Sequence, residues 1–151
     1  MGLHFSVEEF KNRKDKVIKL LKEEKLDAIL MFRQESMYWL TGYDTFGYVF
    51  FQTLVLDQKG NIILLTRAPD LRQAQNTSNI SDIRIWVDKN GSNPTEDLKV
   101  ILDELNLKGK KIGIEYEAYG LTGRNALRLN KSLENYCSIE DTSELVTKLR
   151  V

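Results

Sequence analysis

The sequence predicts a single α/β domain. Short apolar runs alternate along the chain with segments whose apolar residues recur at helical spacing. Two of these runs, residues 48–56 and 62–66, are separated by only five residues. Such a link is too short for a crossover helix, so the two runs are expected to form an antiparallel hairpin. At 151 residues the chain has about the size of one domain.

A helix, a buried strand and a second helix are expected first. Residues 7–24 place apolar side chains at near-helical spacing among charged ones, and Ser6 begins a capping-box pattern before them. The continuous apolar run 27–32 is typical of a strand that is covered on both faces. A short helix follows over residues 34–40 and is ended by Gly42.

The hairpin comes next and leads to a helix and a strand. Pro69 suits the first position of a short helix over residues 69–75. Residues 82–87 alternate between apolar and polar side chains, which indicates a half-buried or edge strand. In this strand we expect Trp86 on the exposed face.

The second half of the chain continues the alternation. Asn93 and Pro94 have the residue types of an N-cap and a first helical residue. The remaining expected elements are a strand at 111–115, a helix that opens at 121–122, a strand at 136–139, and a helix at 145–149 after a cap in 141–144. That closing helix has no C-cap pattern, from which we expect the natural protein to continue.

The complete prediction is one three-layer domain over residues 1–151. It has a mixed, mostly parallel sheet of about six strands with one antiparallel hairpin, and helices on both faces.

Charge and cysteine content argue against several classes of partner. The chain has 22 basic and 22 acidic residues, so it lacks the concentrated positive charge that nucleic acid or an anionic membrane requires. We therefore expect no nucleic-acid and no membrane partner. The single cysteine, Cys137, cannot form an internal disulfide, and the N-terminus has no apolar signal segment. A cytoplasmic location is the expectation.

Residues suited to catalysis are scarce. The one histidine, His4, lies near the N-terminus, and the sequence has no metal-ligand spacing and no phosphate-binding glycine loop. Glu115 and Glu117 at a strand end could bind a hard cation, although such a pair is more often a solvated face. The sequence therefore predicts no catalytic and no metal-binding residue in this chain.

Residues 36–47 are the most informative stretch, a short helical turn that runs into an aromatic loop. Tyr43 and Phe46 lie between two glycines, which gives large, stiff side chains on a backbone free to bend. This composition suits binding, and a buried corner of the core is the alternative. Arg67, at the end of a predicted strand, could donate to a carboxylate ligand or form a surface salt bridge.

Several segments, taken in order, match one known family. They are the opening helix and residues 26–30, 38–43, 65–67, 109–115 and 141–150. Residues 38–43, Tyr-Trp-Leu-Thr-Gly-Tyr, stand where that family has a Tyr-Leu-Thr-Gly signature, and Trp39 is a small departure from it. Over nearly its full length the chain resembles the N-terminal domain of the creatinase, aminopeptidase P and prolidase family.

The resemblance implies a domain that precedes a larger C-terminal catalytic domain, which is absent from this chain. In a peptidase that domain would carry a pair of divalent metal ions (Mn, Co or Zn), whereas creatinase uses a metal-free, histidine-based site; no cofactor is expected here. The resemblance also implies a homodimer in which the N-terminal domain contacts its own catalytic domain and the mouth of the partner subunit's active site. By position, the substrate-mouth candidates are Tyr43, Asp44, Phe46 and Arg67.

The expected function is that of the non-catalytic N-terminal domain of a Xaa-Pro peptidase, of the aminopeptidase P or prolidase type, with small peptides as substrates. Two alternatives stay open. One is the N-terminal domain of a creatinase-like C–N amidohydrolase that acts on a small amide. The other is a non-enzymatic binding or scaffold module with the same fold.

Overall fold

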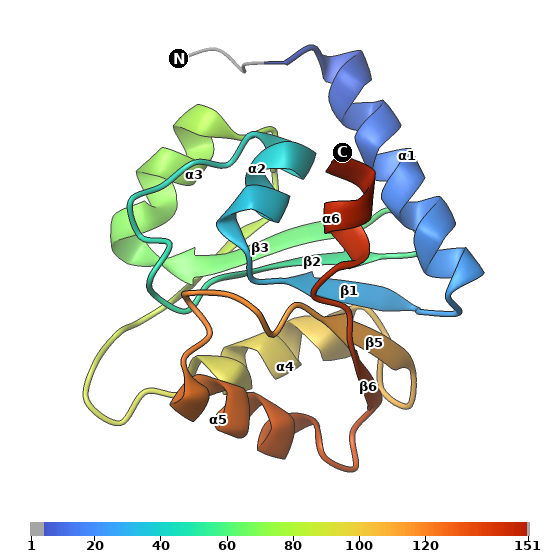
Figure 1. Ribbon diagram of the computed structural model, residues 1–151. Coiled ribbons are helices and arrows are strands. Elements are labelled where there is room, and N and C mark those ends of the chain that lie inside the picture. The colour runs from blue at the N-terminus through green and yellow to red at the C-terminus, as the bar shows by residue number, and fades with distance from the viewer. Residues whose placement is uncertain (1–4, 151) are drawn as a thin grey trace.

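The computed structural model describes residues 5–150 and shows three layers (Figure 1). A six-stranded sheet forms the middle layer. One face of the sheet is covered by α1 (Val7–Glu23), α2 (Gln34–Thr41), α3 (Leu71–Thr77) and α6 (Leu145–Arg150), and the other by α4 (Pro94–Glu104) and α5 (Gly123–Leu133). A 3-10 turn, η1 (Ala68–Asp70), leads into α3. The predicted three-layer α/β fold is confirmed.

The sheet is mixed and mostly parallel, as predicted. Its strands are β1 (Ala28–Met31), β2 (Thr53–Asp57), β3 (Ile62–Arg67), β4 (Ile83–Trp86), β5 (Lys111–Ile114) and β6 (Ser138–Asp141). They lie in the order β4-β3-β2-β1-β5-β6. Only β2 is antiparallel to its neighbours, and it forms the expected hairpin with β3. The Asp57 carboxylate holds the connecting turn, because it accepts the backbone N–H groups of Lys59 (3.0 Å) and Asn61 (2.8 Å).

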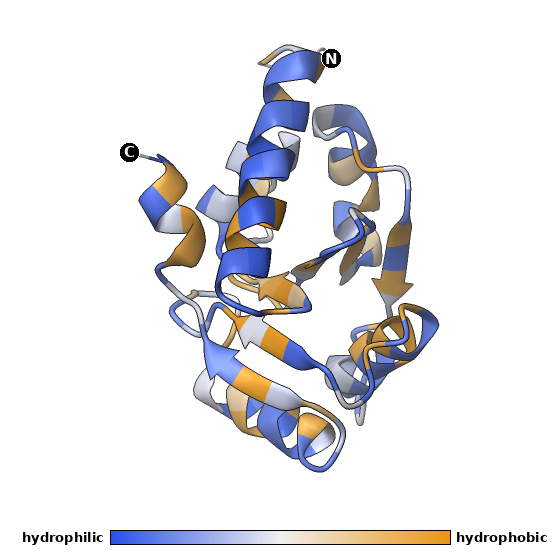
Figure 2. Cartoon of the chain, turned by 90° about the vertical axis from the view of Figure 1, so that its right-hand side faces the viewer, coloured by the Kyte–Doolittle hydropathy of each residue, from blue (hydrophilic) through white to orange (hydrophobic). Residues whose placement is uncertain are grey.

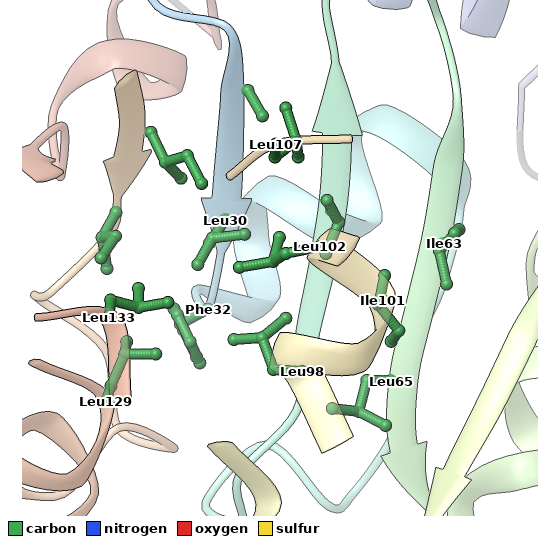
Figure 3. Close-up of a cluster of buried hydrophobic side chains, with 14 of the residues drawn as sticks. Leu30, Phe32, Ile63, Leu65, Leu98, Ile101, Leu102, Leu107, Leu129 and Leu133 are labelled. Carbon is green, nitrogen blue, oxygen red and sulfur yellow. The ribbon is translucent and has the colours of Figure 1, made fainter. Parts of the chain in front are cut away.

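The central strand β1 contributes to an apolar core on each face of the sheet. All four of its residues are buried, and successive side chains of a strand point to opposite faces. Ala28 and Leu30 accordingly pack on the α4 and α5 side, and Ile29 and Met31 on the α1 and α2 side. Figure 3 shows the first of these clusters, with Leu98 and Leu102 of α4 reaching toward the strands.

Helix α1 is amphipathic, as its spacing predicts. Figure 2 shows a mostly hydrophilic outer surface on this helix, while Phe10, Val17 and Leu21 are buried beneath it. The Ser6 hydroxyl accepts the Glu9 backbone N–H at 3.1 Å, which is the first half of the expected capping box. The Glu9 carboxylate accepts instead from the guanidinium of Arg13 at 3.1 Å, so the reciprocal half is replaced by an ion pair.

Two predicted strands are displaced from their expected bounds. The apolar run 48–56 is a strand only from Thr53 onward, because the Phe50 backbone N–H donates to the Gly47 carbonyl and closes a turn. The last strand begins at Ser138 instead of residue 136. Tyr136 is buried in the core before that strand, and its hydroxyl donates to the Asp103 carboxylate.

The expectation that Trp86 lies on an exposed face is wrong. Its side chain is buried and its indole N–H donates to the Phe51 carbonyl at 2.9 Å. The Trp86 and Phe51 rings also pack edge to face, with centroids 6.2 Å apart. β4 is an edge strand, but the chain around residue 51 and the α4 side of the sheet cover this end of it.

We predict that Leu102→Ala lowers the free energy of unfolding by about 2–5 kcal/mol, because Leu102 is fully buried and the truncation leaves a cavity. The measurement is urea unfolding followed by circular dichroism. Val100→Ala is the matched control on the same helix, since Val100 is 59% exposed, and it should change the free energy by less than about 0.5 kcal/mol. Equal effects of the two substitutions would contradict the described packing of α4.

Candidate functional site

The loop of residues 43–50 connects α2 to the chain that enters β2, and it begins with a buried anchor. α2 ends at Gly42, whose φ of 84° is the left-handed conformation that favours glycine. The next residue, Tyr43, is fully buried, and its hydroxyl donates to Gln52 Oε1 at 2.6 Å. Burial raises the pKa of Tyr43 to about 12, so this phenol is neutral at physiological pH. Tyr43 therefore fixes the start of the loop and does not present its ring to solvent.

Asp70 holds the middle of the loop in place through hydrogen bonds. The Thr45 hydroxyl donates to Asp70 Oδ1 at 2.8 Å and accepts the Gly47 backbone N–H at 3.0 Å. Gly47 lies so close to this carboxylate that a Cβ at that position would collide with it. The Asp44 backbone N–H donates to the Thr77 hydroxyl at 2.9 Å, which ties the loop to α3. These contacts give the loop a defined backbone path.

Arg67, at the end of β3, supports the last part of the loop. Its Nε lies 3.4 Å from Asp70 Oδ2, and its Nη1 lies 3.8 Å from Asp88. The guanidinium carbon stands 3.5 Å from the centre of the Phe50 ring, which is a cation–π contact. The Arg67 side chain is only 15% exposed. The expected salt bridge is thus present, and the positive charge of Arg67 faces two carboxylates of its own chain.

The braced loop presents apolar side chains to solvent. Phe46 is 91% exposed at its tip, and Tyr48, Val49 and Phe50 are each about half exposed. Asp44 is exposed beside them. Of the four substrate-mouth candidates, Phe46 and Asp44 are accessible, Arg67 is partly covered, and Tyr43 is inside the core.

Glu115 occupies a position that its sequence context did not reveal. The expectation of a solvated or cation-binding pair with Glu117 is wrong for Glu115, which is fully buried. Its carboxylate accepts the backbone N–H groups of Phe32 (3.1 Å) and Arg33 (3.0 Å) and the Ser36 hydroxyl (2.7 Å). Burial raises the pKa of Glu115 to about 7, and these hydrogen bonds oppose the rise.

The Glu115 contacts join the residue after β5 to the start of α2. A carboxylate is well placed at a helix N-terminus, where backbone N–H groups lack partners within the helix. The sequence places Glu115 at the end of a predicted strand, but no local signal shows that this strand pairs with β1, and that pairing brings the carboxylate to the start of α2.

A family model describing the creatinase/prolidase N-terminal domain matches residues 13–151. The chain belongs to this family. An uncharacterised hydrolase/peptidase of Sinorhizobium fredii is 27% identical over an alignment of length 155, and the match covers 98% of this chain and 39% of that protein. The dipeptidase from Pyrococcus horikoshii has a structure with a TM-score of 0.73 and 25% identity over 91% of this chain and 36% of its own.

A third relative is solved as a domain of similar extent. The creatinase/prolidase N-terminal domain of an X-Pro dipeptidase from Streptococcus pyogenes has a TM-score of 0.72 at 18% identity, over 91% of this chain and 98% of that one. The similarity of this structure supports the fold of the present chain. This chain spans about two fifths of the length of the Sinorhizobium fredii relative.

Metal-binding residues do not converge in the part of the chain that the structure describes. Within residues 5–150, no group of three or more His, Cys, Asp or Glu side chains could hold a metal ion. Residues 5–150 therefore do not fit the pair of divalent metal ions that the resemblance implies for the catalytic domain. His4 lies outside the described residues. No helix within residues 5–150 is long and apolar enough to cross a bilayer.

We predict that Glu115→Gln changes how stability depends on pH. The folded-state pKa of about 7 exceeds the ordinary value of 4.5, so between these values the folded state binds more protons than the unfolded state. The contribution of Glu115 to the free energy of unfolding is therefore full below about pH 4.5 and falls by about 3 kcal/mol as the pH rises through about 7.

The measurement is urea unfolding of both proteins at several values between pH 4.5 and 8. Glutamine can accept the Phe32 and Arg33 N–H groups but does not titrate, so the difference in stability between the two proteins should vary across this range. A difference in stability between the two proteins that stays constant with pH would contradict the raised pKa of Glu115. Asp57→Asn is the control, a buried carboxylate at the opposite end of the sheet.

Proposed function

We propose that this chain is the non-catalytic N-terminal domain of a cytoplasmic hydrolase, a Xaa-Pro peptidase of the aminopeptidase P or prolidase type. The observation that carries the proposal is the family match over residues 13–151. The dipeptidase and X-Pro dipeptidase structures with the same fold support the substrate class. The divalent metal pair and the catalytic groups of such an enzyme belong to a further C-terminal domain, with which this domain pairs.

The loop of residues 43–50 is the part of the domain that we propose to contact the partner subunit in a homodimer, at the mouth of its substrate pocket. Phe46 is the central contact. Leaving a phenylalanine 91% exposed keeps an apolar surface in water, and burying it against a partner contributes about 1.5–3 kcal/mol. Asp44 lies beside it as a polar contact, and buried Tyr43 holds the loop at its base.

Arg67 acts in this proposal through the loop. To pair with a substrate carboxylate, its guanidinium would need to turn away from Asp70 and Asp88 or to share its donors with them. Its stacking on Phe50 is already in place and keeps the end of the loop ordered. We therefore assign Arg67 a positioning role at the pocket mouth, with a direct contact to substrate as the second possibility.

We predict that Phe46→Ala in the full-length protein lowers kcat/KM for Xaa-Pro peptides by about tenfold to a hundredfold, the equivalent of the lost apolar burial. Dimer content, followed by sedimentation, should fall with it. Val87→Ala is the control, because Val87 is 62% exposed and lies outside the loop. Unchanged kcat and KM across Xaa-Pro dipeptides and tripeptides would overturn the assignment of Phe46. Hydrolysis of creatine instead of these peptides would favour the amidohydrolase alternative.

We predict that the isolated 151-residue chain releases no product from Xaa-Pro dipeptides in the presence of Mn²⁺ or Co²⁺. The physical reason is the lack of a convergent ligand set within residues 5–150. The measurement is chromatographic detection of free proline, with the full-length protein as the positive control. Metal-dependent turnover by the isolated chain would contradict the non-catalytic assignment. A full-length protein without hydrolase activity would favour the scaffold alternative.

A further inference from the structure

A cavity of about 430 Å³ lies beside the carboxyl ends of β1 and β5. It is lined by residues 32–35, which follow β1, by residues 116–119, which follow β5, and by Tyr48 from the loop described above. We call it the switch-point cavity. Its volume falls within the range that small-molecule sites occupy.

The topology of the sheet explains why a cavity forms here. β1 and β5 are parallel neighbours, so their carboxyl ends meet at one edge of the sheet. From β1 the chain enters α2 on one face, whereas after β5 it leads to α5 on the opposite face (Figure 1). The two connections diverge and leave a crevice between them. Such a switch point is the usual ligand position in open α/β sheets.

Aromatic rings form much of the cavity wall. Phe32, Tyr48, Tyr116 and Tyr119 all line it. Tyr48 and Tyr119 pack edge to face with centroids 6.0 Å apart, yet they remain 45% and 81% exposed. Tyr116 is fixed by a 2.5 Å hydrogen bond from its hydroxyl to Asn130. The exposed rings of Tyr48 and Tyr119 offer aromatic faces of the kind that attract cations.

The charged groups of the cavity favour the same ligand class. The Arg33 guanidinium is turned to α6 and Glu35, because it donates to the Ser143 carbonyl (3.2 Å), the Thr147 hydroxyl (3.3 Å) and the Glu35 carboxylate (3.3 Å). Glu117 is exposed at the cavity and forms no ion pair within residues 5–150. The positive charge of Arg33 is balanced by the negative charge of Glu35, so the carboxylate of Glu117 leaves the cavity lining with a net negative charge.

An anion is disfavoured for a separate reason. Just before α2, the backbone N–H groups of Phe32 and Arg33 already donate to the buried Glu115 carboxylate, so a negative group lies beside the start of the helix. A second negative charge there would meet the carboxylates of Glu35 and Glu117 in the cavity lining.

We propose that the switch-point cavity binds a small organic cation, an alkylammonium or guanidinium group, held by the carboxylate of Glu117 and the rings of Tyr48 and Tyr119. The two proposals share Tyr48, which lies in the loop of residues 43–50, whereas Glu117 and Tyr119 are used by the cation site alone.

The test is an NMR titration of the ¹⁵N-labelled chain with n-butylammonium and n-butylguanidinium, with n-butanol as the neutral probe of similar size. A domain of similar extent from the family is solved by itself, which supports working with this chain alone. We expect saturable shifts confined to residues 32–35, 48 and 116–119, with a dissociation constant on the order of millimolar. n-Butanol should bind at least about fivefold more weakly.

Variants assign the contacts. Glu117→Gln and Tyr119→Ala should each weaken the binding of the two cations by about threefold or more. Glu117→Gln should leave the binding of n-butanol unchanged. The controls are Glu23→Gln, an exposed carboxylate on α1, and Phe46→Ala, an exposed ring outside the cavity lining; both should bind as the parent chain does. Equal binding of n-butanol, shifts outside the cavity, or no effect of Glu117→Gln would overturn the proposal. Loss of peptidase activity in Phe46→Ala with cation binding intact would separate the two proposals.

Discussion

The arrangement of this domain depends on one buried carboxylate. Glu115 accepts hydrogen bonds from Phe32, Arg33 and Ser36, and thereby joins the end of β5 to the end of β1 and the first turn of α2. A helix N-terminus has backbone donors without intrahelical partners, and a carboxylate placed against them is stabilised by those donors and by the helix dipole. α2 begins at this point and ends at Gly42, whose left-handed backbone leads into the loop of residues 43–50.

The loop of residues 43–50 follows α2 and is held by contacts at three places. Tyr43 anchors its start in the core, Asp70 holds Thr45 and crowds Gly47 in its middle, and Arg67 stacks on Phe50 at its end. The result is an ordered platform from which Phe46 projects. Since conformational order is already present, a partner that buries Phe46 need not supply the free energy of ordering the loop. This supports a contact surface more than a flexible connection.

The sequence predicted the candidate site only in part, for identifiable reasons. It singled out the aromatic loop because composition shows rings and glycines, but it could not tell that Tyr43 turns inward while Phe46 turns outward. It offered a salt bridge for Arg67 without naming a partner. Asp70 lies only three residues away, whereas Asp88 comes near Arg67 only when β4 pairs with β3. Glu115 was misplaced because the donors that hold it lie 79 to 83 residues earlier in the chain.

The sequence by itself determined the α/β class, the order of helices and strands, and the β2–β3 hairpin, because apolar periodicity and a short turn are local properties of the chain. Only the tertiary structure decided what depends on distant neighbours. The pairing of β1 with β5 created the switch-point cavity and buried Glu115, and the covering of edge strand β4 buried Trp86. Burial and hydrogen-bond partners are set by the packing of distant segments, which no local pattern of residues encodes.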